Sequence, residues 1–284
     1  MSPMITSTSN QRIKEARKLH DRRGRGTTNR LLLEGVRLIS DAVQSGVLPD
    51  LVFYTPEAVL TNVSAARLVQ QLQTVGVECL PCTPAVFATL AETVTPQGVA
   101  ARVPLPNLAT PPHPTFILVL DQVRDPGNAG TLLRTAEAAG VDLVLFAPET
   151  VDPYNDKVMR AAMGAHFRLP LRTCATWSDV QAWLTPRHQC YVAESAAPTA
   201  YDQVDWHPPV AFIVGGEAEG ASSAARAAAQ PVAIPMHGAV ESLNAAIAGA
   251  IILFEAARQR RQVIANCELR IANECLTSRD IHNS

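Results

Sequence analysis

The sequence predicts an α/β protein in which a small N-terminal α/β domain precedes a mostly parallel sheet with helices on both faces. Three observations indicate this class. Short apolar runs alternate with helical patterns over roughly the first 100 residues. Five prolines then fall between positions 104 and 114, a density typical of a stiff, extended linker. Beyond them, Phe116–Leu120 is wholly apolar, as in a strand buried on both faces of a parallel sheet.

The N-terminal domain is predicted to open with a helix that carries Ile13, Ala16 and Leu19 on one side. Residues 24–28 are predicted as a loop beyond it. The strands that follow are predicted over residues 31–35, 51–54, 77–80 and 98–103. The helices between them are predicted over residues 36–44, 65–74 and 84–91. We assign residues 1–105 to this domain and residues 106–115 to the linker.

The second domain, residues 116–261, is predicted as the succession of strands and helices typical of a mostly parallel sheet. Its strands are predicted over residues 116–120, 141–146, 189–193, 211–214 and 232–234. Its first helices are predicted from the Asp125–Gly130 turn to Gly140, over residues 157–163 and 177–184, and from residue 221 or 222. Residues 262–284 form a tail whose structure the pattern does not predict.

A last helix is predicted from Ser242 to about residue 258, with the Ser242 hydroxyl as its N-cap. Its apolar stripe comprises Leu243, Ile247, Ile251 and Phe254. Gly249 costs roughly 1 kcal/mol relative to Ala inside a helix, which predicts a close backbone approach there. Polar residues at the positive end of this helix, next to a strand end and a glycine loop, favour a ligand pocket. An ordinary capped strand–helix unit is the alternative.

Composition limits the class of protein. The chain has 284 residues, of which 47% are apolar, enough for a full core in two domains. No apolar run reaches the length of a membrane span, and the first 20 residues are not signal-like, so we expect a cytoplasmic protein without a membrane partner. Among six cysteines, Cys79 and Cys82 form a C-x-x-C that no second Cys or His pair completes to a zinc set. Reduced structural thiols and no bound metal are the expectation.

Charge is uneven along the chain. Residues 1–37 carry nine Lys or Arg against three Asp or Glu, whereas residues 111–284 carry 13 against 18. A polyanionic partner would therefore meet the N-terminal part first. Phosphate contacts are predicted from six clustered cations: Lys14, Arg17, Lys18, Arg22, Arg23 and Arg25. A solvated basic arm without a partner is the alternative interpretation.

Two glycine-rich loops, Gly127–Gly130 and Gly215–Gly220, leave strand ends. Neither matches the dinucleotide fingerprint, and the sequence contains no P-loop, zinc-protease or G-x-S-x-G motif. Polar residues remain at the strand-to-helix turns: Asn128, Arg134, Glu217, Ser242 and Asn244. Because the carboxyl ends of parallel strands converge on one crevice, these side chains are candidates for one site. Taken singly, each also suits a structural role as a cap, a first-turn carboxylate or a surface residue.

Three segments resemble, in order, the three motifs of the SpoU (TrmH-like) branch of the SPOUT RNA methyltransferases. They are Asp125–Arg134 (DPGNAGTLLR), Ile213–Ser222 (IVGGEAEGAS) and Ile234–Asn244 (IPMHGAVESLN). The stretch between the first two motifs, residues 157–170, also resembles the family. The N-terminal stretches 5–9, 17–19 and 33–35 resemble the substrate-binding domain that many members carry. Gly216 and Ala162 depart from residues common in the family, but neither is a named catalytic position.

The resemblance implies S-adenosylmethionine as methyl donor and a ribose 2′-hydroxyl of structured RNA, ribosomal or transfer RNA, as acceptor. It implies a homodimer and a C-terminal trefoil knot, a threaded topology that is rare among folds. The cofactor would be held, largely through backbone groups, by Gly215, Gly216, Ile234, Met236 and Leu243. The reacting site would comprise Asn128, Arg134, Glu217, Ser242 and Asn244. A dimer built partly on the last helix is also suggested by its small residues Ala245, Ala246, Gly249 and Ala250.

Arg134 is the family's usual candidate for helping the ribose hydroxyl to lose its proton. Arginine stays protonated in proteins, so a guanidinium that orients the phosphate and stabilises the developing alkoxide agrees better with its chemistry. The alternative class is a non-catalytic RNA-binding protein on an inactive methyltransferase fold. A small-molecule enzyme with a doubly wound sheet is a third reading, but it leaves the basic N-terminal segment unexplained. The sequence identifies neither the RNA nor the nucleotide.

Overall fold

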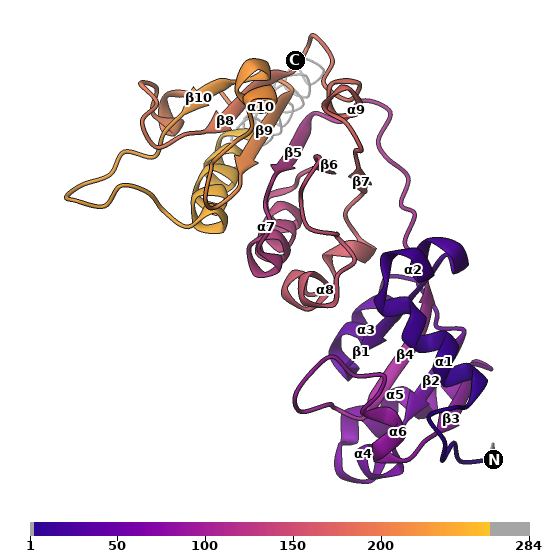
Figure 1. Cartoon of the computed structure of the whole chain (residues 1–284). Helices are drawn as coiled ribbons and strands as arrows, with labels where there is room; N and C mark the ends of the chain where they lie inside the picture. The colour runs from indigo at the N-terminus through magenta and orange to yellow at the C-terminus, as the bar shows by residue number, and fades with distance from the viewer. Residues whose placement is uncertain (1–2, 262–284) are drawn as a thin grey trace, which may run out of the picture. The chain divides into compact units, whose positions relative to one another are not determined.

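The computed structural model of this chain describes residues 3–261 (Figure 1). The tail expected at residues 262–284 lies outside the described residues. The chain forms two compact units. The N-terminal unit comprises Met1–Ala109 and Asp152–Pro170, and the C-terminal unit comprises Thr110–Val151 and Leu171–Ser284. Within residues 3–261, no helix is long and apolar enough to cross a membrane.

The N-terminal unit is built on a four-stranded mixed sheet in the order β1-β4-β2-β3. Its strands are β1 (Arg30–Glu34), β2 (Leu51–Tyr54), β3 (Glu78–Pro81) and β4 (Val99–Pro104). Strand β4 runs antiparallel to β1 and β2, whereas β2 and β3 are parallel. All four predicted strands are present.

Helices cover both faces of this sheet. They are α1 (Gln11–Arg17), η1 (Lys18–His20), α2 (Arg22–Thr28), α3 (Val36–Gln44), α4 (Pro56–Thr61), α5 (Val63–Thr74), α6 (Pro84–Phe87), α8 (Asp156–Ala162) and η2 (Ala165–Phe167). Helices α3 and α5 share an apolar cluster with Leu31 and Leu33, and α1 and α6 share a second cluster with Leu32. Successive residues of β1 belong to different clusters because side chains alternate between the two faces of a strand.

Residues 24–28 belong to helix α2, so the loop predicted there is wrong. A Cβ on Gly24 would overlap the carbonyl oxygen of Lys18, so this glycine serves a close contact rather than a bend. Arg25 is only 5% exposed and donates hydrogen bonds to the carbonyl oxygens of Leu19 and His20. Helix α4 was not predicted either, although Thr55 caps it just before a proline.

Residues 152–170 join the N-terminal unit although they lie far from it in the sequence. Met159 and Phe167 belong to the apolar cluster of α3 and α5. Asp152 forms an ion pair with Arg25, and Asp156 Oδ2 lies 2.8 Å from His20 Nδ1. The compact units therefore differ from the proposed domains, which divide the chain at one linker.

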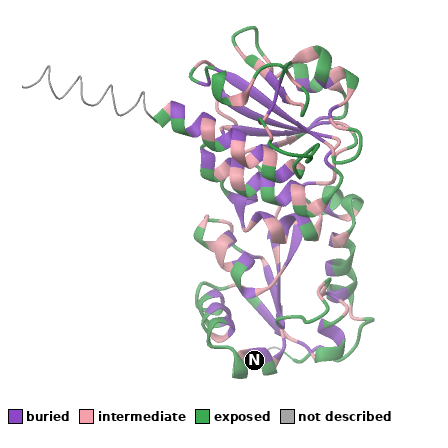
Figure 2. Ribbon diagram, turned by 90° about the vertical axis from the view of Figure 1, so that its left-hand side faces the viewer, coloured by how far each residue is buried: buried purple, intermediate pink, exposed green. Residues whose placement is uncertain are grey.

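The C-terminal unit is built on a six-stranded sheet in the order β10-β8-β9-β5-β6-β7, in which every neighbouring pair is parallel. Its strands are β5 (Phe116–Asp121), β6 (Leu143–Phe146), β7 (Leu171–Thr173), β8 (Gln189–Ala193), β9 (Val210–Gly215) and β10 (Gln230–Val232). Every residue of β5 and β9 is buried, as expected for central strands of a covered sheet (Figure 2). The predicted parallel sheet is confirmed, and β7 is a strand beyond those predicted.

Helices cover both faces of this sheet as well. They are α7 (Pro126–Ala139), α9 (Trp177–Gln181), η3 (Tyr201–Gln203), α10 (Ser223–Ala228) and a last helix over residues 245–261. Val180 of α9 and Ala225 of α10 pack with Ile213 on one face. On the opposite face, a Cβ on Gly249 of the last helix would overlap Leu132 of α7 and lie 3.4 Å from Val214 Cγ2. The close approach predicted at Gly249 is confirmed.

The last helix begins at residue 245, and Asn244 is its N-cap, so the cap predicted at Ser242 is wrong. Asn244 Oδ1 accepts from the backbone N–H groups of Ala246 and Ile247, at 2.9 and 3.2 Å. Ser242 lies exposed in the preceding loop. Both residue types cap helices well, so the local pattern does not choose between them.

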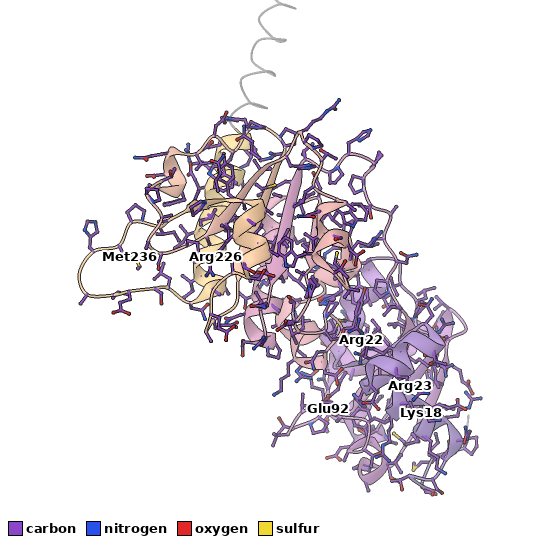
Figure 3. The ribbon with its side chains drawn as sticks, turned by 45° about the horizontal axis from the view of Figure 1, so that its top comes forward. Lys18, Arg22, Arg23, Glu92, Arg226 and Met236 are labelled. Carbon is purple, nitrogen blue, oxygen red and sulfur yellow. The ribbon has the colours of Figure 1, made fainter. Side chains whose placement is uncertain are left out.

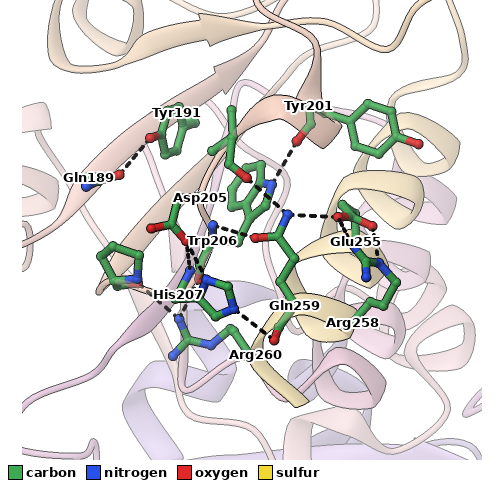
Figure 4. Close-up of polar contacts among 12 residues, drawn as sticks. Gln189, Tyr191, Tyr201, Asp205, Trp206, His207, Glu255, Arg258, Gln259 and Arg260 are labelled. Carbon is green, nitrogen blue, oxygen red and sulfur yellow. Dashed lines mark hydrogen bonds and ion pairs between the residues drawn. The ribbon is translucent and has the colours of Figure 1, made fainter. Parts of the chain in front are cut away.

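A polar network fixes the other end of this helix to the segment before β9 (Figure 4). Gln259 accepts from the backbone N–H of Trp206 and donates to the carbonyl oxygen of Val204, both at 3.0 Å. Arg260 donates to the carbonyl oxygens of Trp206 and Pro208, both at 3.1 Å. These contacts hold the helix whose N-terminal end carries Asn244.

Candidate active site

A cavity of about 510 Å³ opens in the C-terminal unit where β8, β9 and β10 end. Its wall is drawn mainly from residues 193–195, 214–220 and 232–245. Arg226 of α10 and Met236 of the loop before the last helix also line it (Figure 3). The volume is in the range of cofactor pockets, and the carboxyl edge of a parallel sheet is where such pockets form.

The loop after β9 owes its shape to glycines that leave no room for a side chain. A Cβ on Gly215 would overlap the backbone nitrogen of Ala221, and a Cβ on Gly216 would overlap the carbonyl oxygen of Gln122. Gly216 and Gly220 exchange two backbone hydrogen bonds, at 3.0 and 3.2 Å. Residues 216–220, which we call the glycine lip, thus form a tight turn that carries Glu217 at the cavity wall.

Three segments meet through a chain of side-chain amides. Asn244 Nδ2 donates to Asn128 Oδ1 at 3.0 Å, and Asn128 Nδ2 donates to Glu217 Oε1 at 2.7 Å. Asn128 lies in the first turn of α7, where the N-cap Asp125 accepts from its backbone N–H at 2.8 Å. Because each amide accepts on one side and donates on the other, its orientation fixes that of the next. The chain therefore holds the Glu217 carboxylate in one place.

A buried carboxylate that the sequence analysis did not single out holds the far end of the glycine lip. Asp121, the last residue of β5, is fully buried. Its Oδ2 accepts from the backbone N–H of Ser222 at 2.6 Å, and its Oδ1 accepts from Trp177 Nε1 at 3.2 Å. These bonds compensate the cost of burying the carboxylate. They also fix the start of α10, because the Ser222 hydroxyl caps that helix.

The structure brings together most of the residues named from the sequence. All five candidate cofactor residues line the cavity: Gly215, Gly216, Ile234, Met236 and Leu243. Of the five candidate catalytic residues, Glu217, Ser242 and Asn244 line it, and Asn128 joins them through the amide chain. Arg134 is not among them. It is exposed on α7, and its side chain has no hydrogen bond or ion pair with another described residue.

Glu194, Ser195 and Arg226 also line the cavity, and the sequence analysis missed them. Glu194 and Ser195 directly follow β8, whose bounds were predicted correctly. They could have been found by the rule that pointed to the other candidates, namely a polar residue just after a parallel strand. Arg226 carries no such signal, because it lies in the middle of a short alanine-rich helix.

Five of the six candidate RNA-binding cations are exposed on the N-terminal unit: Lys14, Arg17, Lys18, Arg22 and Arg23. Figure 3 labels Lys18, Arg22 and Arg23 there. The prediction that Arg25 contacts phosphate is wrong. Arg25 is buried against Leu19 and His20 and paired with Asp152, so its guanidinium is already neutralised and cannot reach a phosphate.

The thiols within residues 3–261 are free and offer no reactive site. Cys79, Cys82 and Cys174 are buried, and Cys190 is partly buried. Burial raises the pKa of Cys79 to about 11 and that of Cys82 to about 12, so both stay protonated and unreactive at neutral pH. The other two cysteines, Cys267 and Cys275, lie outside the described residues.

His20, Glu92 and Asp156 gather in the N-terminal unit, with donor atoms within 4.8 Å of one another. Burial by itself lowers the pKa of His20, but the hydrogen bond and charge of Asp156 and the charge of Glu92 outweigh it and raise the pKa. The two carboxylates beside His20 favour the charged form of its ring, which accounts for this cluster.

Comparison with known proteins bears on both units. Residues 115–254 match the family model of the SpoU rRNA Methylase family, and residues 10–101 match that of the MRM3-like substrate binding domain. Over 256 residues the chain is 33% identical to the 23S rRNA (guanosine(2553)-2′-O)-methyltransferase RlmP of Bacillus subtilis. That alignment covers 88% of this chain and 97% of the relative.

Solved structures resemble the chain over most of its length. An rRNA methyltransferase from Sinorhizobium meliloti has a TM-score of 0.77 at 29% identity, covering 90% of this chain and 97% of the other. The SpoU methyltransferase AviRb from Streptomyces viridochromogenes, in complex with the cofactor AdoMet, has a TM-score of 0.76 at 29% identity. This match covers 89% of this chain and all of AviRb (100%).

Proposed function

The chain belongs to the SpoU rRNA methylase family, and we propose that the amide chain Asn244–Asn128–Glu217 marks the reacting end of its cavity. The protein is an S-adenosylmethionine-dependent methyltransferase that acts on the 2′-hydroxyl of a ribose in RNA. The proposal therefore concerns which residues of this chain bind the cofactor and align the substrate, and which RNA is methylated.

The cavity suits S-adenosylmethionine in volume and in the chemistry of its lining residues. Gly215 and Gly216 bring bare backbone to the wall at points where a Cβ would not fit. Ile234, Met236 and Leu243 supply apolar surface for a nucleoside, and the wall carries three carboxylates, Glu194, Glu217 and Glu219, against one cation, Arg226. An acidic wall favours a positively charged ligand. When bound, this cofactor supplies a methyl group on a sulfonium that is already a good leaving group.

With the leaving group supplied, the task of the chain is alignment. The amide chain fixes Glu217 and Asn244 relative to α7, so the reacting end keeps its shape before substrate arrives. Ser242 adds an exposed hydroxyl on the same wall. Pre-set polar groups are worth most in catalysis because they do not reorganise during the reaction.

Arg134 has a different part in the proposal. Its side chain is exposed and unpaired among the described residues, and it lies on the same helix as Asn128, six residues further on. A guanidinium that no protein carboxylate neutralises is available to an RNA phosphate and to a developing alkoxide. We therefore assign Arg134 to orienting the substrate and stabilising its charge, not to accepting its proton.

The test compares methyl transfer with cofactor binding in Arg134 variants. Arg134→Ala and Arg134→Lys are expected to lower tritiated-methyl transfer to ribosomal RNA at least roughly 100-fold, the scale of losing one oriented donor. S-adenosylmethionine affinity, measured by calorimetry, should change by less than about threefold. Arg187→Ala is a matched control, because Arg187 is also exposed but precedes β8 and so lies toward the opposite edge of the sheet.

Two outcomes would contradict this assignment. Full transfer by Arg134→Ala would remove Arg134 from the site. A wild-type protein that binds RNA but neither binds S-adenosylmethionine nor methylates any RNA would be the non-catalytic binding protein instead.

The RNA partner is assigned to the exposed cations of the N-terminal unit, Lys14, Arg17, Lys18, Arg22 and Arg23. Support comes from the substrate-binding model that matches residues 10–101 and from relatives named as rRNA methyltransferases. Ribosomal RNA is accordingly the proposed substrate. Methylation mapping of cellular RNA with and without the gene identifies the nucleotide.

A homodimer, a C-terminal trefoil knot and a cytoplasmic location remain proposals that rest on family membership and composition. For the dimer, the structure favours a different face of the last helix from the one that the sequence suggested. Ala246 and Gly249 are buried inside the C-terminal unit, so the small-residue face does not support a partner contact. Leu243, Ile247 and Phe254 are instead 36%, 54% and 45% exposed. Sedimentation at micromolar concentration tests this, since a monomer would exclude a stable dimer on that stripe.

A further inference from the structure

The wall of the cavity includes a side that the family motifs do not supply. Glu194 and Ser195 follow β8, which is separated from β5 by β9. With strands about 4.8 Å apart, the segment after β8 lies roughly 10 Å along the sheet edge from the segment after β5, which leads to Asn128. If the reacting methyl faces Asn128, Glu194 stands where the remainder of the cofactor must lie.

Glu194 is held by Arg226. Arg226 Nε donates to Glu194 Oε1 at 2.7 Å, and Arg226 Nη2 donates to the carbonyl oxygen of Glu219 at 3.2 Å. Gly220 makes room for this contact: its φ is +69°, and a Cβ on it would lie 3.0 Å from Arg226 Nη2. One guanidinium thus ties the end of β8 to the glycine lip. Its helix is set in turn by the bond from Ser222 to buried Asp121.

The Glu194–Arg226 ion pair leaves one carboxylate oxygen of Glu194 free to accept hydrogen bonds from a ligand in the cavity. Glu194 Oε2 makes no hydrogen bond with any described residue, and the Glu194 side chain is 28% exposed. A carboxylate has about four lone-pair sites, of which Arg226 occupies one. Because Arg226 also balances its charge, Glu194 is suited to neutral O–H donors more than to a second cation.

We propose that Glu194 accepts hydrogen bonds from the vicinal hydroxyls of the cofactor's ribose, with Arg226 as the residue that positions it. This assignment rests on the proposed function of the cavity. Two adjacent hydroxyls match the two oxygens of one carboxylate, and an acidic residue following a parallel strand binds ribose hydroxyls in other nucleotide-binding sheets. Glu194 is therefore a specificity-determining residue for a ribonucleoside, and Arg226 couples it to the glycine lip.

The test measures binding, without turnover, of four compounds by calorimetry. The compounds are S-adenosylhomocysteine, its 2′-deoxy and 3′-deoxy analogues, and 5′-methylthioadenosine, which has the ribose but no amino-acid group. Wild type is expected to bind both deoxy analogues about 10- to 100-fold more weakly than S-adenosylhomocysteine, since each leaves an acceptor of Glu194 unpaired. In Glu194→Gln this discrimination should shrink to less than about threefold.

The matched control is Glu219→Gln, a carboxylate of the same wall whose side chain lies outside the Glu194–Arg226 pair. Glu219→Gln should discriminate between S-adenosylhomocysteine and its deoxy analogues as strongly as wild type does. Arg226→Gln should lose more S-adenosylhomocysteine affinity and more discrimination than Arg226→Lys, which retains a donor for Glu194. Thermal unfolding of each variant separates a binding defect from a folding defect.

Each contrary result has a distinct meaning. Undiminished discrimination in Glu194→Gln overturns the ribose assignment. A Glu194→Gln defect that appears with S-adenosylhomocysteine but not with 5′-methylthioadenosine also overturns it, because the carboxylate would then bind the amino-acid end. Failure of wild type to bind any of the four compounds overturns the function of the cavity itself, and the ribose assignment with it.

Discussion

The two units place their functional side chains in opposite ways. In the N-terminal unit the candidate RNA-binding cations are separate exposed side chains on α1, η1 and α2. In the C-terminal unit three of the five candidate catalytic residues, Asn128, Glu217 and Asn244, follow different strands and hold each other through side-chain hydrogen bonds. Long-range attraction to a polyanion tolerates flexible, independent charges, whereas alignment of a reacting atom does not. We therefore expect graded effects of substitution in the first unit and abrupt effects in the second.

The sharpest contrast is expected between two glycines. Gly216→Ala places a methyl group on the carbonyl oxygen of Gln122 and must displace the glycine lip. We expect at least a roughly 100-fold loss of S-adenosylhomocysteine affinity by calorimetry, about 2.7 kcal/mol. Gly26→Ala in α2 is the control, since a Cβ there meets nothing within 4 Å, and its affinity should equal that of wild type. Normal binding by Gly216→Ala would show that the lip is not rigid.

The next effect concerns the amide chain. Asn128→Ala removes both the donor to Glu217 and the acceptor for Asn244. We expect methyl transfer to fall roughly 30-fold through loss of alignment, with cofactor affinity changed by less than about threefold. Asn128→Asp should be at least as impaired, because it sets a second carboxylate against Glu217. If either variant transferred methyl groups at the wild-type rate, the chain would be structural only.

Neutralising cations in the N-terminal unit should give a smaller, graded loss. Replacing Lys14, Arg17 and Lys18 by Gln is expected to weaken RNA binding about tenfold at moderate salt. The slope of log affinity against log salt should fall by about 2, with cofactor affinity unchanged. Arg12→Gln is the control, because Glu78 already neutralises Arg12. An unchanged salt slope in the triple variant would argue that these residues do not contact phosphate.

The smallest effect is a pH dependence of stability from His20. Its pKa is raised in the folded state by Asp156 and Glu92 against the opposing effect of burial. The stabilisation is thus complete below the unfolded-state pKa of about 6.5 and is lost as pH rises through the higher folded-state value. Between pH 6 and 8.5, wild type should lose more unfolding free energy than His20→Gln, by up to about 1 kcal/mol in urea titrations. Parallel pH profiles for the two proteins would contradict this.

The sequence predicted the helices and strands that have a regular apolar pattern, and the polar residues that come directly after a strand. Runs such as Phe116–Leu120 and Ala211–Val214 report strand periodicity and burial through neighbours in the chain. The rule that polar residues after parallel strands converge on one edge therefore identified Glu217, Ser242 and Asn244 of the cavity wall. The resemblance to family motifs supplied the cofactor, which strand patterns alone do not specify.

Only the tertiary structure decided what depends on partners distant in the sequence. Arg25 looks like its neighbours Arg22 and Arg23, yet Asp152, 127 residues away, neutralises it. Arg226 enters the site only through Glu194 and the glycine lip. Periodicity records the faces of a helix or strand, but burial of a charge and contact across 30 or more residues are properties of the packed chain.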